Sequence, residues 1–316
     1  MTTNPNWINY AIDHKYIQLY PHDDFINIRY GDSGGEGRFS RVASAECPRT
    51  NRKVALKKLK NFNLEKFEAE VRMHVSGHSS KNIVRFLGLT QEGTATTYIM
   101  VLEYADRNNL RTFLQKHTNL DWDVKVKLSL DIAKGLSYLH SLNIAHRDLH
   151  SNNVVINQVH HCKELEFIAR ITDFGSATVM NGPDSDGDDV NKVLGQIPFT
   201  DPKHLDDRKN YKKDLRSDIY SLGVVFWEIS SNRPPFINYF PDFRGDFRDL
   251  CLTMEIISGY RERRMLLTPD EFVKLYKQCW DEEPSERPII GEVIEALKKI
   301  NLILTNSLEE TMTIGQ

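Results

Sequence analysis

The sequence has few cysteines, and their spacing forms no pairs. Cys47, Cys162, Cys251 and Cys279 are scattered through 316 residues. A small domain stabilised by disulfides carries closely and regularly spaced cysteines. We therefore expect free thiols in a reducing compartment. The expected location is the cytoplasm, with the nucleus left open.

Long apolar runs and an excess of charge of one sign are also lacking. No apolar stretch reaches the roughly 18–20 residues that a membrane-spanning helix needs. The first twenty residues lack the cationic start and apolar stretch of a signal peptide. The formal net charge is −3, so no overall basic field indicates nucleic acid or an anionic membrane as a partner. With 40% hydrophobic residues, the composition is that of a globular protein.

The first hundred residues are rich in strand patterns. Residues 1–25 are expected to form a short helical or irregular extension. Leu64, Phe67, Val71 and Val75 recur at three- and four-residue spacing, which predicts an amphipathic helix that ends near Gly77. The predicted strands are 26–30, 39–45, 54–59, 83–89 and 98–102.

After Tyr104 the pattern becomes helical. "SDIYSLGVVFWEISS" is apolar nearly all round, which predicts a buried central helix. The chain then consists of a small lobe of strands, about 26–103, and a larger helical lobe, about 104–304, followed by a tail at 305–316. The interface between two lobes is a favoured place for a ligand.

Three features of the small lobe suggest phosphate chemistry, each with a plainer reading. Gly35, Gly37 and Ser40 form a glycine-rich hairpin that could approach a phosphate closely or be only a turn. Lys57 in "KVALKKLK" could reach a phosphate or be one of several surface lysines. Glu70 lies near the buried side of the predicted helix, where a carboxylate needs a cation such as Lys57.

Two stretches of the large lobe suggest metal-assisted chemistry. In "AHRDLHSNNVVI", Asp148 and Asn153 are five residues apart ahead of a strand, and in "ARITDFGSA" Asp173 follows a strand. Carboxylate and amide oxygens are the ligands that Mg²⁺ prefers, and Asp148 would then be free to accept a hydroxyl proton. Each of these residues alone could have a purely structural role, as a turn-capping aspartate, a turn asparagine or a core histidine. These roles do not explain why the residues occur together.

Taken in order, these motifs resemble the signature set of eukaryotic protein kinase catalytic domains. "SDIYSLGVVFWEI" and "CWDEEPSERP" fit the same family, and the resemblance runs from about Ile26 to Ile303. Within this family, the sequence is most similar to the tyrosine-kinase-like group and resembles its fungal members. The resemblance implies an α+β, bilobal fold and a phosphotransferase that uses ATP and Mg²⁺.

The resemblance also assigns roles to individual residues. Asp148 would be the catalytic base, Lys57 held by Glu70 would bind the α- and β-phosphates, and Asn153 and Asp173 would hold Mg²⁺. His146 and Phe174 would stack internally, and Asp218 would brace the backbone of His146 and Arg147. The expected nucleotide-binding residues are Gly35, Gly37, Val42, Ala55, Lys57, Leu102, Glu103, Ala105 and Val155.

Five positions depart from the family pattern. Ser40 replaces a glycine, His150 a lysine, Gln196 a threonine, Asp201 an alanine and Lys203 a glutamate. The lysine and threonine surround the catalytic aspartate in the family, so their loss implies lower turnover. The glutamate normally pairs with the arginine that Arg287 resembles. We expect Asp206 or Asp207 to take its place.

The prediction is therefore a protein kinase that phosphorylates serine or threonine, with tyrosine or dual specificity as an alternative. The other reading is a nucleotide-binding pseudokinase that acts as a scaffold or signalling partner. The expected partners are ATP and a protein substrate, with the chain acting as a monomer that meets its partners transiently.

Overall fold

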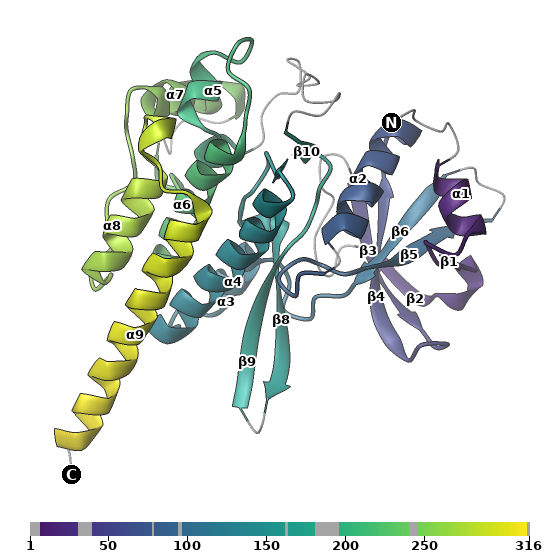
Figure 1. The fold of residues 1–316 in the computed structure, drawn as a ribbon, viewed down its shortest axis with the longest axis horizontal. Coiled ribbons are helices and arrows are strands. Elements are labelled where there is room, and N and C mark those ends of the chain that lie inside the picture. The colour runs from purple at the N-terminus through teal and green to yellow at the C-terminus, as the bar shows by residue number, and fades with distance from the viewer. Residues whose placement is uncertain are drawn as a thin grey trace.

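The chain folds into two lobes of different composition. The computed structural model describes residues 7–30, 40–77, 79–93, 97–161, 164–180, 196–239 and 245–314. Strands β1 to β6 and helices α1 and α2 form the small lobe, while helices α3 to α9 dominate the large one (Figure 1). The predicted α+β, bilobal architecture is confirmed.

The small lobe is built on one six-stranded sheet with the order β1-β5-β6-β4-β3-β2. Its strands are β1 (Leu19–Tyr20), β2 (Ile26–Tyr30), β3 (Ser40–Cys47), β4 (Arg52–Leu59), β5 (Phe86–Gln91) and β6 (Tyr98–Glu103). Helix α2 (Leu64–Gly77) begins where the Asn63 side chain accepts a hydrogen bond from the Lys66 N–H at 2.9 Å. Its buried face, with Phe67 and Val71, packs on a cluster that contains Met100 and Leu102.

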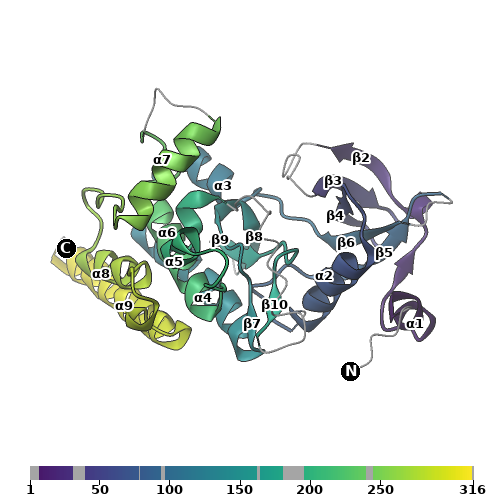
Figure 2. The same cartoon turned by 90° about the horizontal axis from the view of Figure 1, so that it is seen from above.

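The N-terminal segment is an integral part of the small lobe. Helix α1 (Trp7–Asp13) buries Ile8 and Ala11 in the same cluster as Phe67 of α2. Strand β1 adds to the sheet edge by pairing in parallel with β5. Seen from above, α1 lies at the end of the small lobe that is far from the large lobe (Figure 2). The Arg72 guanidinium of α2 lies 3.8 Å from the ring centroid of Trp7. The segment therefore supports α2 from its outer side.

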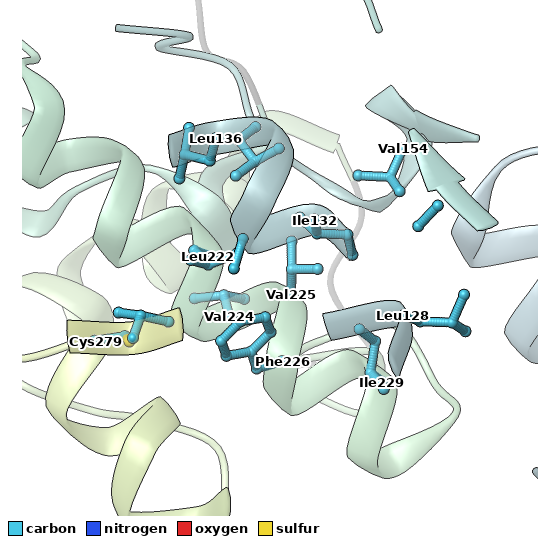
Figure 3. Close-up of a cluster of buried hydrophobic side chains, with 14 of the residues drawn as sticks. Leu128, Ile132, Leu136, Val154, Leu222, Val224, Val225, Phe226, Ile229 and Cys279 are labelled. Atoms are coloured by element: carbon cyan, nitrogen blue, oxygen red, sulfur yellow. The ribbon is translucent and has the colours of Figure 1, made fainter. Parts of the chain in front are cut away.

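The core of the large lobe forms between two long helices. Apolar residues of α4 (Trp122–Ser141), including Ile132 and Leu136, meet Leu222 and Val225 of α6 (Leu215–Ser231) (Figure 3). Asp214 caps the start of α6 through the N–H groups of Arg216 and Ser217. The remaining helices are α3 (Leu110–Lys116), α5 (Pro202–Asp206), α7 (Gly245–Ile257), α8 (Asp270–Cys279) and α9 (Ile290–Ile314).

Short strands carry the loops that face the small lobe. Strand β7 (Ile144–Ala145) pairs with β10 (Thr178–Val179), and β8 (Val154–His161) pairs with β9 (Glu164–Ile171). The Val84 N–H donates to the Ile171 carbonyl at 2.9 Å, which joins the two lobes behind the site.

Two predicted boundaries differ from the structure. The strand predicted at 83–89 begins only at Phe86, because Ile83 forms a bridge with Ile171 in the large lobe instead of pairing within the sheet. Helix α9 continues to Ile314 and so includes most of the segment 305–316, which the sequence analysis set apart as a tail.

Across the part of the chain that the structure describes, no helix is long and apolar enough to cross a membrane. Cys47, Cys251 and Cys279 are free thiols, and Cys162 falls outside the described residues.

Gly88 allows β1 to join the sheet. An added Cβ would lie 2.2 Å from the Gln18 carbonyl oxygen, and the φ of Gly88 is +153°. We expect Gly88→Ala to lower the free energy of unfolding by about 2–4 kcal/mol in urea titrations. Gly93→Ala is the control, because its φ is +58° but, apart from its chain neighbours, no atom of the described residues lies within 4 Å of the added Cβ. Equal losses in the two variants would contradict the steric argument.

Candidate functional site

A buried lysine lies between two carboxylates at the junction of the lobes. The Lys57 Nζ donates to Glu70 Oε1 at 2.5 Å and to Asp173 Oδ1 at 2.8 Å. The Lys57 side chain is 5% exposed and that of Glu70 2%. Three segments distant in sequence, namely β4, α2 and the turn after β9, therefore meet at one ammonium group.

Lys57 and Asp173 hold each other ionised, whereas burial raises the pKa of Glu70 in spite of the neighbouring Lys57. Burial alone would lower the pKa of Lys57, but the carboxylates of Asp173 and Glu70 outweigh it and raise that pKa above its ordinary value. Burial would likewise raise the pKa of Asp173, but Lys57 lowers it to about 2. Asp173 therefore stays a carboxylate at neutral pH, as a metal ligand must.

The loop that carries Asp148 is braced from the large-lobe core. The fully buried Asp218 of α6 accepts the N–H groups of His146 and Arg147, both at 2.8 Å. It also contacts His140 Nε2 at 3.0 Å. Arg147 has a φ of +65°, a conformation that a non-glycine residue adopts only when its surroundings hold it. The expected brace by Asp218 is thus present in the geometry.

Asn153 ties the end of the loop to Asp148. Its Nδ2 donates to the Asp148 carbonyl at 2.9 Å and lies 3.5 Å from Asp148 Oδ2. The Thr172 N–H donates to the Asn153 carbonyl at 2.9 Å, so the loop is also fixed to the segment ahead of Asp173. Asp148, Asn153 and Asp173 are therefore held in one region by backbone contacts.

Phe174 is packed inward between two histidines. Its ring centroid lies 5.5 Å from that of His146 and 4.7 Å from that of His74, both in edge-to-face arrangement. His146 Nε2 donates to the Thr172 carbonyl at 3.1 Å. The stacking expected for His146 and Phe174 is present, and His74 of α2 extends it into the small lobe.

Apolar residues line the space where the lobes meet. Ala55 of β4 and Val155 of β8 pack against the cluster that contains Leu102, although they come from different lobes. In the sheet, Ala55 lies opposite Leu102 and Val42 lies opposite Lys57. The apolar residues of this cluster thus come from both lobes.

The main chain after β6 is tied to its surroundings. The Glu103 N–H donates to the Arg85 carbonyl, and the Tyr104 carbonyl accepts from Asn157 Nδ2, both at 2.9 Å. Ala105 follows and is half-buried. The remaining predicted nucleotide-binding residues, Gly35 and Gly37, lie outside the described residues.

The donor set fits a hard divalent cation. Asp173 offers carboxylate oxygens, and Asn153 uses its amide nitrogen on Asp148, which leaves the amide oxygen for a metal. Within the described ranges, no three His, Cys, Asp or Glu side chains gather in a group that could enclose a metal. Phosphate oxygens or water would therefore complete the coordination of Mg²⁺, as this ion commonly requires.

His150 is buried beside Asp148 as a neutral side chain. Its Nδ1 accepts from the Asn152 N–H at 3.2 Å, and its Nε2 lies 3.7 Å from Asp148 Oδ1. Burial lowers its pKa. The ring packs on Phe199 at 5.9 Å, and no hydrogen bond joins it to Gln196 within the described part of the chain.

The expected partner of Arg287 was wrong. Its carboxylate is Asp201, bound through both terminal nitrogens at 2.6 and 3.0 Å, and both side chains are fully buried. Asp206 and Asp207 are exposed at the end of α5, and Asp207 binds Asn210 instead. Lys203 turns away toward Glu283, with 3.3 Å between Nζ and Oε2. The ion pair has thus moved two residues along the chain.

The surroundings of Arg287 complete this arrangement. Its other N–H groups donate to the carbonyls of Asp281, Arg216 and Glu282, at 2.9, 3.0 and 3.3 Å. All five guanidinium donors are therefore used. Asp201 also accepts from Ser217 and Tyr211 and caps α5 through the Lys203 N–H.

The roles of three residues near the site were missed from the sequence: His74, Asp201 and Lys213. His74 lies one helical turn after Glu70, so helical spacing would place it on the same face. Asp201 directly precedes a proline that begins α5, which is a recognisable capping position. Lys213 lies next to the loop of Asp148 with no local signal.

Comparisons with known proteins agree with this geometry. A sequence model described as protein tyrosine and serine/threonine kinase matches residues 28–297. The chain is 27% identical over 297 residues to a probable LIM domain-containing serine/threonine-protein kinase of Dictyostelium discoideum, covering 92% of this chain and 42% of that protein.

Two further relatives have related names. The chain is 32% identical over 303 residues to the dual specificity protein kinase zakA of Dictyostelium discoideum, covering 89% of this chain and 36% of zakA. It is 27% identical over 251 residues to the serine/threonine/tyrosine-protein kinase HT1 of Arabidopsis thaliana, covering 78% of this chain and 58% of HT1. The chain thus spans less than two thirds of each of these relatives.

Asp201→Ala would leave the Arg287 charge buried without its carboxylate. We expect a loss of about 3–5 kcal/mol in the free energy of unfolding, measured by urea titration. Adding Lys203→Glu should recover part of the loss, because it restores a carboxylate where the family carries one. Asp206→Ala, at an exposed position, should change stability by less than about 0.5 kcal/mol. A mild effect of Asp201→Ala would mean that Arg287 has another way to be compensated.

His74 makes stability depend on pH. Burial, with the nearby charge of Lys57, lowers its pKa from 6.5 to about 3. Between these values the unfolded chain binds a proton that the folded chain does not, so stability falls as pH drops below 6.5. We expect His74→Leu to remove about 2 kcal/mol of the stability lost between pH 7 and pH 5. Urea titrations at both pH values test this, and an identical pH dependence in both proteins would refute it.

Proposed function

The chain belongs to the protein tyrosine and serine/threonine kinase family, and we propose that it transfers the γ-phosphate of ATP to a protein hydroxyl. The acceptor is serine or threonine, with tyrosine as a second acceptor in a dual-specificity enzyme, a reading that the names of its relatives support. The observation that carries the proposal is Lys57 held between Glu70 and Asp173, beside a braced Asp148.

In this proposal the adenine lies between the lobes. Val42 and Ala55 cover one face and Val155 the other, and Leu102 closes the back of the space. The main chain at Glu103 and Ala105 hydrogen-bonds the base. The backbone of Gly35 and Gly37 covers the phosphates, and Lys57 binds the α- and β-phosphates.

Asp148 acts on the protein substrate. It accepts the proton of the acceptor hydroxyl, whose oxygen attacks the γ-phosphorus while the bond to the bridging β–γ oxygen breaks and ADP leaves. Asn153 keeps Asp148 oriented through the 2.9 Å hydrogen bond to its carbonyl. Bound Mg²⁺ would neutralise phosphate charge, with Asp173 and Asn153 as its protein ligands.

Several features of the cellular context belong to the same proposal. We infer a signalling kinase that works in the cytoplasm, as a monomer with transient partners and without nucleic acid or membrane. The free thiols of Cys47, Cys251 and Cys279 are consistent with a reducing compartment. The longer relatives carry additional sequence, so substrates and partners are properties to be measured on the natural protein.

Asp148→Asn and Lys57→Met should each abolish most phosphate transfer. We expect the rate of phosphate incorporation into the protein itself and into a generic basic substrate to fall by about 100-fold or more. Lys58→Met is the matched control, because Lys58 follows Lys57 on β4 but pairs with the exposed Glu92 at 2.7 Å. Its rate should stay close to that of the unmodified protein.

The same assay separates the proposal from a scaffold. If the unmodified protein is stabilised by MgATP in a thermal unfolding measurement but incorporates no phosphate, the pseudokinase reading is correct. Mapping of phosphorylated residues by mass spectrometry decides between serine or threonine and tyrosine.

A further inference from the structure

The loop around Asp148 carries no lysine of its own. Residues 146–153 read "HRDLHSNN", and His150 occupies the position where the family has a lysine. Because burial lowers the pKa of His150, that side chain is neutral at pH 7. The positive charge that the family places beside the catalytic aspartate is therefore missing from this loop.

Lys213 comes to the same place from another part of the chain. It directly precedes Asp214, the residue that caps α6. Its Nζ donates to the Arg147 carbonyl at 3.1 Å, so it binds the residue just before Asp148. Asp148 and Lys213 also line one narrow cavity, together with Gln196, Thr200 and Asp201.

Lys213 holds the Arg147 backbone from the side opposite to Asp218. Asp218 accepts the Arg147 N–H at 2.8 Å, and Lys213 donates to the Arg147 carbonyl. Arg147 itself has the unfavourable φ of +65°. Hydrogen bonds on both sides of a strained residue fix its conformation, and with it the direction in which Asp148 leaves the main chain.

The charges around Lys213 indicate which carboxylate it serves. Burial lowers its pKa, and Asp148 is the strongest of the carboxylates that oppose this, ahead of Asp218 and Asp201. Asp201 is occupied by Arg287, and Asp218 by two N–H groups and His140. Among the described residues, the carboxylate oxygens of Asp148 have only long contacts, 3.5 Å to Asn153 and 3.7 Å to His150.

We propose that Lys213 is a positioning residue for Asp148, which holds the loop through the Arg147 carbonyl and supplies the positive charge that His150 does not. The charge thus reaches the site from the segment between α5 and α6 rather than from the loop itself. The effect on phosphate transfer rests on the kinase function proposed above, whereas the effect on the loop does not.

The test compares Lys213→Met, Lys213→Arg and Lys209→Met in the full chain. Lys209 is an exposed lysine of the same segment and serves as the control. With a generic basic substrate, Lys213→Met should lower kcat by about 10- to 100-fold and leave the KM for ATP within about twofold. Lys213→Arg should recover most of kcat, because it keeps the charge and a donor. Lys209→Met should resemble the unmodified protein.

Two results would overturn the proposal. One is an unchanged kcat in Lys213→Met while Asp148→Asn is inactive, which leaves the kinase function standing. The other is an equal loss of kcat in Lys213→Met and Lys213→Arg, accompanied by equally lowered thermal unfolding temperatures. The loss of kcat would then reflect impaired folding alone.

Amide hydrogen exchange tests the same idea without catalysis. Peptides that cover residues 145–153 should exchange faster in Lys213→Met than in Lys213→Arg or Lys209→Met. If the unmodified protein transfers no phosphate, the proposed function fails and this measurement alone decides. Unchanged exchange in Lys213→Met would then refute the positioning role.

Discussion

The site depends on one buried ammonium group that is shared by two carboxylates. Lys57 lies on a strand, Glu70 on a helix and Asp173 in the other lobe, so their contacts fix three elements at once. Burying such charges costs nearly as much as their attraction returns, so the cluster adds little net stability. Its effect is geometric, because any displacement of α2 or of the turn after β9 would leave a buried charge without its partner.

In the large lobe, two further buried charged groups fix the main chain around α6. Asp218 near its start holds the main chain of the catalytic loop, and Arg287 lies beside it with all five donors satisfied. Both groups are buried next to the packed α4–α6 core. The loop of Asp148 is therefore held by the buried core of the large lobe rather than by its own short sequence.

The sequence was a good guide where the signal was local or followed an ordered set of motifs. Hydrophobic alternation and helical spacing predicted β4, α2 and α6, and the motif order predicted which residues would gather around Lys57. It failed where the partner is remote: Ile83 pairs with Ile171, and β1 pairs in parallel with β5. Arg287 was paired with Asp206 or Asp207 only because they follow Lys203 in the chain. The cap of α5 instead turns Asp201 inward, and Lys213 likewise gains its neighbours only from the fold.

The substitutions at positions 201 and 203 differ in their effect on the buried Arg287, because only one of them adds a carboxylate. The order in which the two are made therefore affects stability. Starting from the family pattern of alanine at 201 and glutamate at 203, a first change of the glutamate to Lys203 would have left Arg287 buried without a carboxylate. A first change of the alanine to Asp201 would have placed two carboxylates near Arg287. The glutamate at 203 could then have been lost while Arg287 kept a partner. A path through a protein with both acids keeps a carboxylate on Arg287 at every step, whereas a path that begins with Lys203 does not.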